Sequence, residues 1–96
     1  MSSAYVLANV RVTNPQQYEE YKRLSTIAMK AHGAEVCTRG GKTEVLEGDW
    51  TPDRVVLLKF PSLEQARAFY DSPEYQAAKK AREGAAVMRM LLVDGV

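Results

Sequence analysis

Two predicted strands of this chain are apolar on both of their sides, and this restricts the fold more than any other feature. Segments 54–60 and 87–93 include the apolar runs 55–58 and 90–93. Successive side chains of a strand point to opposite faces of its sheet, so both faces are apolar here. If helices cover one face, the other should be polar where it meets water. We therefore expect a second copy to cover that face, packed about a twofold axis.

The first third of the chain predicts a strand followed by a long helix. Residues 5–12 alternate between two sets of side chains, with the period of a strand. Asn14 is a favoured N-cap, Pro15 suits the first helical position, and Gly33 supplies a stop. Helical spacing places one set of side chains on the buried face: Tyr18, Tyr21, Leu24, Ile27, Ala28 and Ala31.

The glycine pair at 40–41 leaves two interpretations open. Segments 34–39 and 43–47 both favour extended structure, so the pair forms either a two-residue hairpin turn or a kink within one long strand. A hairpin would give five strands, with the last parallel to the first. We favour the kink, which preserves a simple antiparallel sheet, and we expect residues 49–53 to form the next turn.

The second half predicts a strand, two helical segments and a final strand. After the strand 54–60, Ser62 and Gln65 form a capping box, and Ser72 followed by Pro73 begins a second helical segment. The order is β-α-β-β-α-β, an α+β ferredoxin-like arrangement in one domain spanning residues 1–96. Helices are expected on one face of the antiparallel sheet, and two such sheets are expected to pair into a dimeric α/β barrel.

Composition excludes several classes of partner. Thirteen basic and twelve acidic residues give a formal charge of +1, so no overall field attracts nucleic acid or anionic lipid. No apolar run approaches the roughly 20 residues that span a bilayer. The N-terminus lacks a secretory pattern and the lone Cys37 cannot form an internal disulfide, so we expect a cytoplasmic protein. We expect Cys37 to be a small apolar filler of its strand.

Several motifs along the chain resemble those of a known family. They are Arg39-Gly40-Gly41, Leu46-Glu47-Gly48-Asp49-Trp50, Phe60-Pro61-Ser62, Ala66-Arg67-Ala68-Phe69-Tyr70 and Ser72-Pro73-Glu74-Tyr75. Together with Tyr18, Tyr21 and the segment 82–85, they resemble the family called domain of unknown function 1330, almost from end to end. The resemblance implies membership of the dimeric α/β-barrel superfamily and brings no established activity. Its wider relatives include cofactor-independent monooxygenases, isomerases, haem-degrading oxygenases, dye-decolorising peroxidases and chlorite dismutases, many with a small-molecule cleft between sheet and helices.

Arg39 and Glu47 are the candidate catalytic residues. They flank the glycine pair and combine a permanent cation with a carboxylate that exchanges protons, a combination suited to an acidic or enolisable small molecule. The alternative is an ion pair that holds the kinked segment in shape, because two adjacent glycines leave the backbone unusually free.

Five further residues are candidate ligand contacts: Asn9, Tyr21, Trp50, Ser72 and Tyr75. Asn9 is the odd polar residue of an apolar strand and needs either a structural partner or a polar cavity. Trp50 is either a lid over a ligand or a plug at the dimer seam. Tyr75 lies in a first helical turn whose free amides, beside Ser72, suit an anion.

No metal or cofactor motif is present in the sequence. His32 is the only histidine and suits the C-terminal end of the first helix, where the helix dipole favours a cation. The sequence leaves two functions open. One is a cofactor-independent oxygenase or isomerase acting in a cleft lined by the candidate residues, and the other is a non-catalytic module that binds a small molecule or another protein.

Overall fold

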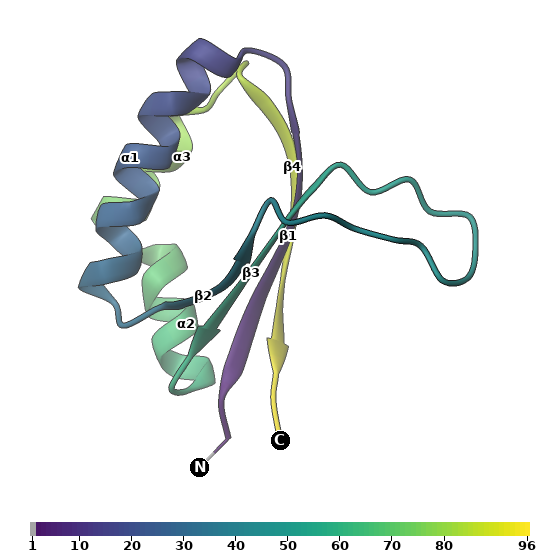
Figure 1. The fold of residues 1–96 in the computed structure, drawn as a ribbon. Helices are drawn as coiled ribbons and strands as arrows, with labels where there is room; N and C mark the ends of the chain where they lie inside the picture. Colours follow the sequence, from purple (N-terminus) through teal and green to yellow (C-terminus); the bar gives the residue numbers. More distant parts are fainter. Residues whose placement is uncertain (1) are drawn as a thin grey trace.

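The fold is a four-stranded antiparallel sheet with three helices on one face (Figure 1), as seen in a computed structural model that describes residues 2–96. The elements are β1 (Ala4–Val12), α1 (Pro15–Ala31), β2 (Glu35–Arg39), β3 (Arg54–Phe60), α2 (Leu63–Asp71), α3 (Pro73–Ala81) and β4 (Ala86–Asp94). The strand order is β2-β3-β1-β4, and each neighbouring pair is antiparallel. This confirms the expected α+β, ferredoxin-like arrangement.

The three helices begin at the caps that the sequence indicates. The side-chain oxygen of Asn14 accepts a hydrogen bond from the Gln17 amide at 3.1 Å. Ser62 and Ser72 cap α2 and α3 in the same way, each through a 3.1 Å bond to an amide three residues later. Because each cap satisfies an otherwise unpaired amide of the first turn, the starts of the helices are local properties of the sequence. No helix of residues 2–96 is both long enough and apolar enough to cross a membrane.

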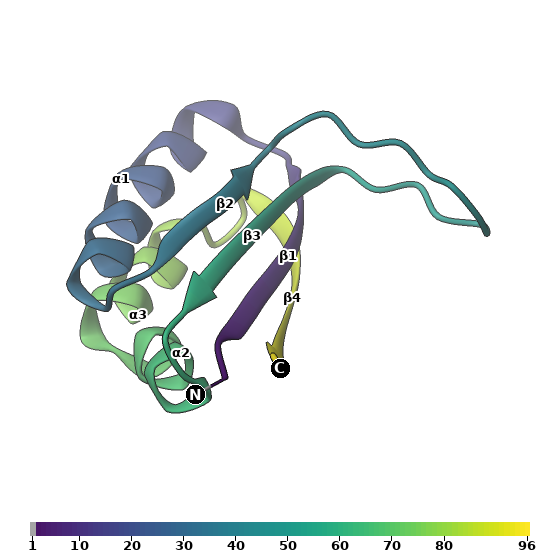
Figure 2. The same cartoon turned by 60° about the horizontal axis from the view of Figure 1, so that its bottom comes forward.

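The core lies between the sheet and the helices, all of which stand on one side of the strands (Figure 2). Alternate residues of β1 and β3 face this layer and are buried: Ala4, Val6, Ala8, Val10, Leu58 and Phe60. The helices contribute the aromatic residues Phe69 and Tyr75, each 1% exposed. The helices therefore cover most of this sheet face within one chain, and the β4 residues Met88, Met90 and Leu92 are partly buried.

The opposite face of the sheet, which we call the open face, is apolar and uncovered. Leu7 lies at its centre, beside Leu57 on one neighbouring strand and Leu91 on the other. Leu91 is 51% exposed and Val93 is 45% exposed. The prediction that both faces of these strands are apolar is confirmed.

Residues 40–53 form an arm that leaves the sheet between β2 and β3 and projects away from the helices (Figures 1 and 2). Gly40 directs the chain off the sheet with a φ of +81°, a value that glycine adopts without strain. The chain does not reverse at Gly40, so the four-stranded interpretation holds. The strand predicted at 43–47 is wrong, because no neighbouring strand is present there to pair with it.

The strand β2 also contains an irregularity that the alternating pattern does not reveal. The pairing register with β3 shifts between Val36 and Thr38, which leaves Cys37 at a bulge. Cys37 is exposed, so its predicted role as a buried filler is wrong. A bulge changes which side chains face the core, because it adds one residue to the period of two.

Candidate functional site

Two phenol groups meet at the centre of the layer between sheet and helices. The hydroxyl groups of Tyr21 and Tyr75 lie 2.9 Å apart, and both side chains are buried. Each hydroxyl also lies near a methionine sulfur of β4, with Tyr21 at 3.9 Å from Met88 and Tyr75 at 4.0 Å from Met90. The surrounding cavity measures about 20 Å³, room for about one water molecule.

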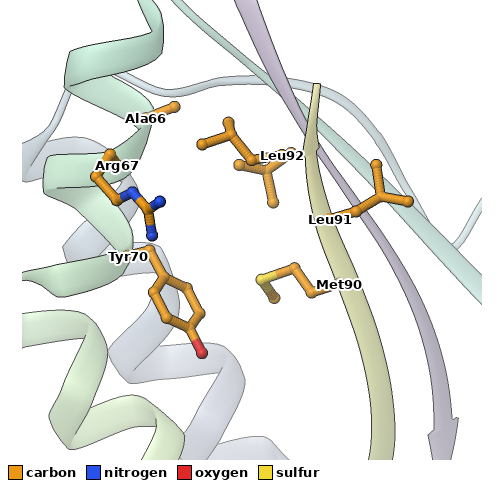
Figure 3. A pocket seen from close by; sticks show the side chains of 7 residues that line it. Ala66, Arg67, Tyr70, Met90, Leu91 and Leu92 are labelled. Atoms are coloured by element: carbon orange, nitrogen blue, oxygen red, sulfur yellow. The ribbon is translucent and has the colours of Figure 1, made fainter. Parts of the chain in front are cut away.

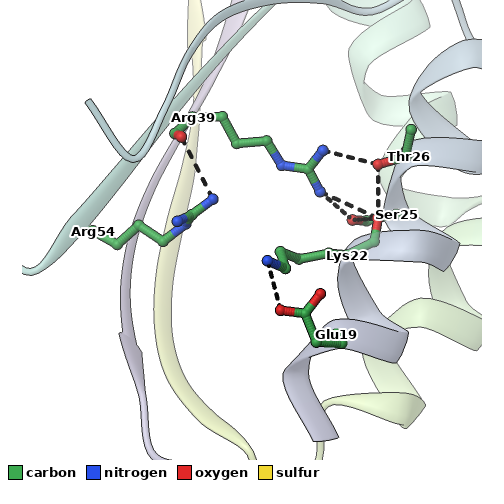
Figure 4. Close-up of polar contacts among 6 residues, drawn as sticks. All are labelled: Glu19, Lys22, Ser25, Thr26, Arg39 and Arg54. Atoms are coloured by element: carbon green, nitrogen blue, oxygen red, sulfur yellow. Dashed lines mark hydrogen bonds and ion pairs between the residues drawn. The ribbon is translucent and has the colours of Figure 1, made fainter. Parts of the chain in front are cut away.

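Arg39 reaches from the end of β2 across to α1 (Figure 4). One terminal nitrogen of its guanidinium donates to the Thr26 hydroxyl at 2.8 Å. The other donates to the Ser25 hydroxyl and to the Lys22 carbonyl, both at 3.2 Å. A planar guanidinium carries several N–H donors and can bond to more than one acceptor at once. Arg39 therefore joins an edge strand of the sheet to the first helix.

Two further arginines lie near this layer without acidic partners. Arg54 donates to the Arg39 carbonyl at 3.5 Å, and the Arg82 guanidinium lies 5.6 Å from the centre of the Tyr21 ring. The Nε atoms of both are buried without a hydrogen-bond partner among residues 2–96. Neither Arg54 nor Arg82 takes part in an ion pair among residues 2–96. This end of the layer is therefore electropositive.

The phenols of α1 titrate above their ordinary range. Burial raises the pKa of Tyr18, and the charges of Arg54 and Arg39 partly oppose that rise. Burial also raises the pKa of Tyr21, and the neighbouring Tyr75 raises it further. Both phenols are therefore neutral near neutral pH and do not act as bases there.

The raised phenol pKa values predict a loss of stability at alkaline pH. Tyrosine in an unfolded chain loses its proton near pH 10, whereas folded Tyr18 and Tyr21 still hold theirs. The unfolded state then binds fewer protons, so the free energy of unfolding falls as pH rises above about 10 and is insensitive to these groups below it. Urea unfolding across that range should show the fall, and Tyr21→Phe should reduce its slope. An unchanged slope in Tyr21→Phe would contradict this assignment.

An open cleft of about 200 Å³ lies between α2 and β4 (Figure 3). Its lining is mostly apolar, and α2 contributes two polar side chains, Arg67 and Tyr70. The residues that line the cleft are Val6, Ala66, Arg67, Tyr70, Met90, Leu91 and Leu92. The Arg67 guanidinium and the Tyr70 ring stand opposite the Met90 and Leu92 side chains, whereas Leu91 points to the other side of β4. Lys79 donates to the Tyr70 hydroxyl at 2.9 Å, which places a second cation beside the cleft.

The cleft and the phenol cavity are neighbours. Val6 and Met90 line both, and the rings of Tyr70 and Tyr75 lie 5.4 Å apart between centres. Methionine has three flexible bonds and adapts its shape readily. Met90 is therefore a deformable partition between the open cleft and the two buried phenols.

Asn9 and Trp50, two predicted ligand contacts, lie on the open face. The Asn9 side chain accepts a hydrogen bond from the Asp53 amide at 2.9 Å and donates to the Asp53 carboxylate at 3.3 Å. Asn9 thus has a structural partner and fixes the base of the arm. Trp50 is 59% exposed and shares a hollow of about 220 Å³ with Asn9, Val55 and Leu91.

The structure does not bring Arg39 and Glu47 together within one chain. Arg39 is turned toward α1, whereas Glu47 is exposed on the arm. No ion pair joins them among residues 2–96. The predicted cleft lining is divided, with Arg39 and Tyr21 beneath the sheet and Asn9 and Trp50 above it. That Arg39 and Glu47 act together in catalysis stays a prediction.

Ser72 and Tyr75 are placed by the junction of α2 and α3. The Ser72 hydroxyl donates to the Phe69 carbonyl at 2.7 Å and accepts from the Tyr75 amide at 3.1 Å. The Tyr75 amide, one of the first-turn amides expected to suit an anion, therefore already donates to the Ser72 hydroxyl. The Tyr75 side chain reaches Tyr21, as described above.

The candidate site residues named from the sequence do not include those that line the open cleft. Arg67 and Tyr70 are three residues apart on α2, a spacing that places them on one helix face, and this was the available signal. His32 was expected to interact with its own helix end, yet its Nε2 lies 2.9 Å from the Glu74 carboxylate of α3. No sequence pattern predicts that contact, because it depends on how α1 and α3 pack. No potential metal cluster is found within residues 2–96.

Proteins of known structure share this fold. A protein of unknown function from Rhodopseudomonas palustris is 24% identical, with a TM-score of 0.76 over 99% of this chain and 83% of that one. A cofactor-independent oxygenase from Streptomyces nogalater is 12% identical, with a TM-score of 0.68 over 96% of this chain and 91% of that one. A dimeric ferredoxin-like protein of unknown function from Thermobifida fusca is 16% identical, with a TM-score of 0.62 over 99% and 92%.

The family model described as domain of unknown function (DUF1330) matches residues 3–96. No curated protein matches the sequence. The family match thus covers nearly the whole chain, while the structural similarity at these identities concerns the fold.

Proposed function

This chain belongs to the DUF1330 family, and we propose that it binds a small aromatic or enolisable acid in the cleft between α2 and β4. The observation that carries the proposal is the pairing of Arg67 and Tyr70 with an apolar wall from β4. An apolar lining with a few convergent polar groups is typical of small-molecule sites. The cleft measures about 200 Å³, below the usual range of roughly 300–1,000 Å³, which favours a small ligand.

The charges beside the cleft favour an anion. The planar guanidinium of Arg67 matches a carboxylate or an enolate, and Lys79 adds a second positive charge through its bond to the Tyr70 hydroxyl. No acidic residue lines the cleft. Both cations would therefore lower the pKa of a bound acid and favour its deprotonated form.

We propose a cofactor-independent oxygenase or isomerase as the catalytic form of this function. A bound carbanion or enolate can react with dioxygen at carbon, so that a CH₂ group becomes a carbonyl and the second oxygen atom leaves as water. The substrate supplies all four electrons in that reaction, and no cofactor is needed. The Streptomyces nogalater oxygenase, which shares the fold, supports this class of chemistry.

A non-catalytic binding function is the second candidate. The residues that line the cleft include no carboxylate and no histidine, so the cleft itself supplies no ordinary proton acceptor near neutral pH. This favours sequestration or transport of an acid that is already ionised.

We also propose that the protein is a cytoplasmic homodimer, one domain per chain, joined through the open face. Apolar residues at the centre of that face have no cover within residues 2–96. The Thermobifida fusca protein of the same fold is dimeric, which supports the proposal. The exposed, unpaired Cys37 suits a reducing compartment.

The test of the proposed site uses 1,4-dihydroxy-2-naphthoate as an aromatic acid that can be oxidised. We expect saturable binding by calorimetry and at least a roughly tenfold loss of affinity in Arg67→Gln, as for the removal of a charged hydrogen bond. Arg23→Gln is the control, because it removes the same charge from the exposed face of α1. Equal affinities in the two variants would overturn the site.

Oxygen uptake separates the two candidate functions. With the same acid, an oxygenase should consume oxygen faster than the protein-free solution, and Arg67→Gln should lower that rate. Binding without added oxygen uptake would contradict the oxygenase for this substrate class and favour the binding function. A native mass spectrum of the freshly purified protein would report the dimer and any acid that is retained.

A further inference from the structure

The arm formed by residues 40–53 has almost no support from its own chain. Residues 40–51 are all exposed, and no hydrogen bond within residues 2–96 involves residues 41–52. Two of its apolar side chains are prominent, with Leu46 87% exposed and Trp50 59% exposed. An extended segment that presents apolar groups and unpaired backbone groups needs either solvent or a partner, and the apolar groups favour a partner.

We propose that the arm of each subunit clasps the body of a second copy of this chain. This inference rests on the proposed dimer and specifies a contact beyond the open face. The arm projects from the same side of the sheet as that face (Figures 1 and 2). Trp50 and Val55 line the hollow on the face and also the hollow along the arm, so the two surfaces are continuous.

The length of the arm suits this role. Residues 41–46 lead outward, and an extended chain covers about 3.3 Å per residue, which gives a reach of roughly 20 Å. Two sheets packed face to face lie about 10 Å apart. The tip around Leu46 therefore extends beyond the plane of a partner sheet and contacts the edge of the partner's body.

The distribution of charge favours a second copy as the occupant. Residues 40–53 contain one lysine and four acidic residues, a net charge of −3. The rest of the chain contains twelve basic and eight acidic residues, a net charge of +4. The arm of one subunit and the body of another thus attract each other, which directs their association.

The test is photo-cross-linking from the tip of the arm. The protein is prepared with Leu46 replaced by benzoylphenylalanine, in unlabelled and ¹⁵N-labelled forms that are mixed and allowed to exchange before irradiation. We expect cross-linked peptides that join an arm of one isotope to a body of the other. The same probe at Ile27, which is 48% exposed on α1, is the control and should give no mixed-isotope peptides.

The outcomes separate this inference from the proposed dimer. A protein that is monomeric by light scattering would overturn both. A dimer in which cross-links from position 46 join only peptides of the same isotope would overturn the clasp and leave the face-to-face dimer intact.

Trp50 is the only tryptophan, so its fluorescence emission gives a second measurement on the unaltered protein. Dilution below the dimer dissociation constant should shift that emission to longer wavelength, and a constant emission would contradict the clasp.

Discussion

Leu7→Asp should convert the proposed dimer into a folded monomer. Leu7 occupies the centre of the open face, between Leu57 and Leu91, so a twofold interface would bury two copies of the new carboxylate. Burying an unpaired charge costs several kcal/mol per ion. A tenfold change in affinity corresponds to about 1.4 kcal/mol, so the dissociation constant should rise by at least about 1,000-fold. Sedimentation velocity across a range of concentrations measures this change.

The control for this prediction is Leu63→Asp. Leu63 is 42% exposed at the start of α2, on the other side of the molecule from the open face. The same change of side chain there should leave the dimer unaffected. Circular dichroism should show folded protein for both variants. A Leu7→Asp protein that remains a dimer would exclude the open face as the interface.

Tyr75→Ala should cause the largest loss of stability among single substitutions in the core. The ring is 1% exposed and packs against Phe69 and Tyr70, with ring centres 4.9 Å and 5.4 Å away. Removing a large buried aromatic side chain costs about 3–5 kcal/mol. Total stabilities are only about 5–15 kcal/mol, so a large part of the folded population is at risk. Urea unfolding at one fixed protein concentration measures the loss.

Tyr75→Phe separates the hydroxyl from the ring. Phenylalanine keeps the aromatic packing but leaves the Tyr21 hydroxyl with only the weak sulfur acceptor of Met88. We expect a loss of about 1–3 kcal/mol, the range for a buried polar group that loses its partner. If Tyr75→Phe is as unstable as Tyr75→Ala, the hydroxyl pair rather than the ring determines the stability of this layer. If both variants are as stable as the unaltered protein, the packing of Tyr75 against Phe69 and Tyr70 is wrong.

Only the residue types of the candidate site could be predicted from the sequence, and their arrangement could not. Arginine, tyrosine and tryptophan were expected to meet a ligand, and phenols and arginines do gather between the sheet and the helices. The sequence does not determine that Arg39 bonds to Ser25 and Thr26 rather than to Glu47. That choice depends on the approach of β2 to α1 and on the departure of the arm, neither of which is a local property.

Local interactions explain what could be predicted from the sequence alone. The caps Asn14, Ser62 and Ser72 act within three residues, so they determine the starts of the helices wherever those helices later pack. The alternation of apolar residues determines the strands in the same way. The continuous apolar runs of β3 and β4 make both faces of these strands apolar, because successive side chains point to opposite faces, and this predicts the need for a cover.

Tertiary structure decided the features that depend on distant segments. Within α1, Ser25 is fully buried where the Arg39 guanidinium bonds to it, and Ile27 is 48% exposed, against the predicted stripe. Residues 43–47 have strand-like composition but lack a neighbouring strand, and a strand is stable only when its backbone groups are paired. Cys37 lies outside the core because of a bulge in the pairing of β2 with β3. Each of these outcomes depends on which segments meet in space, and a local pattern does not contain that information.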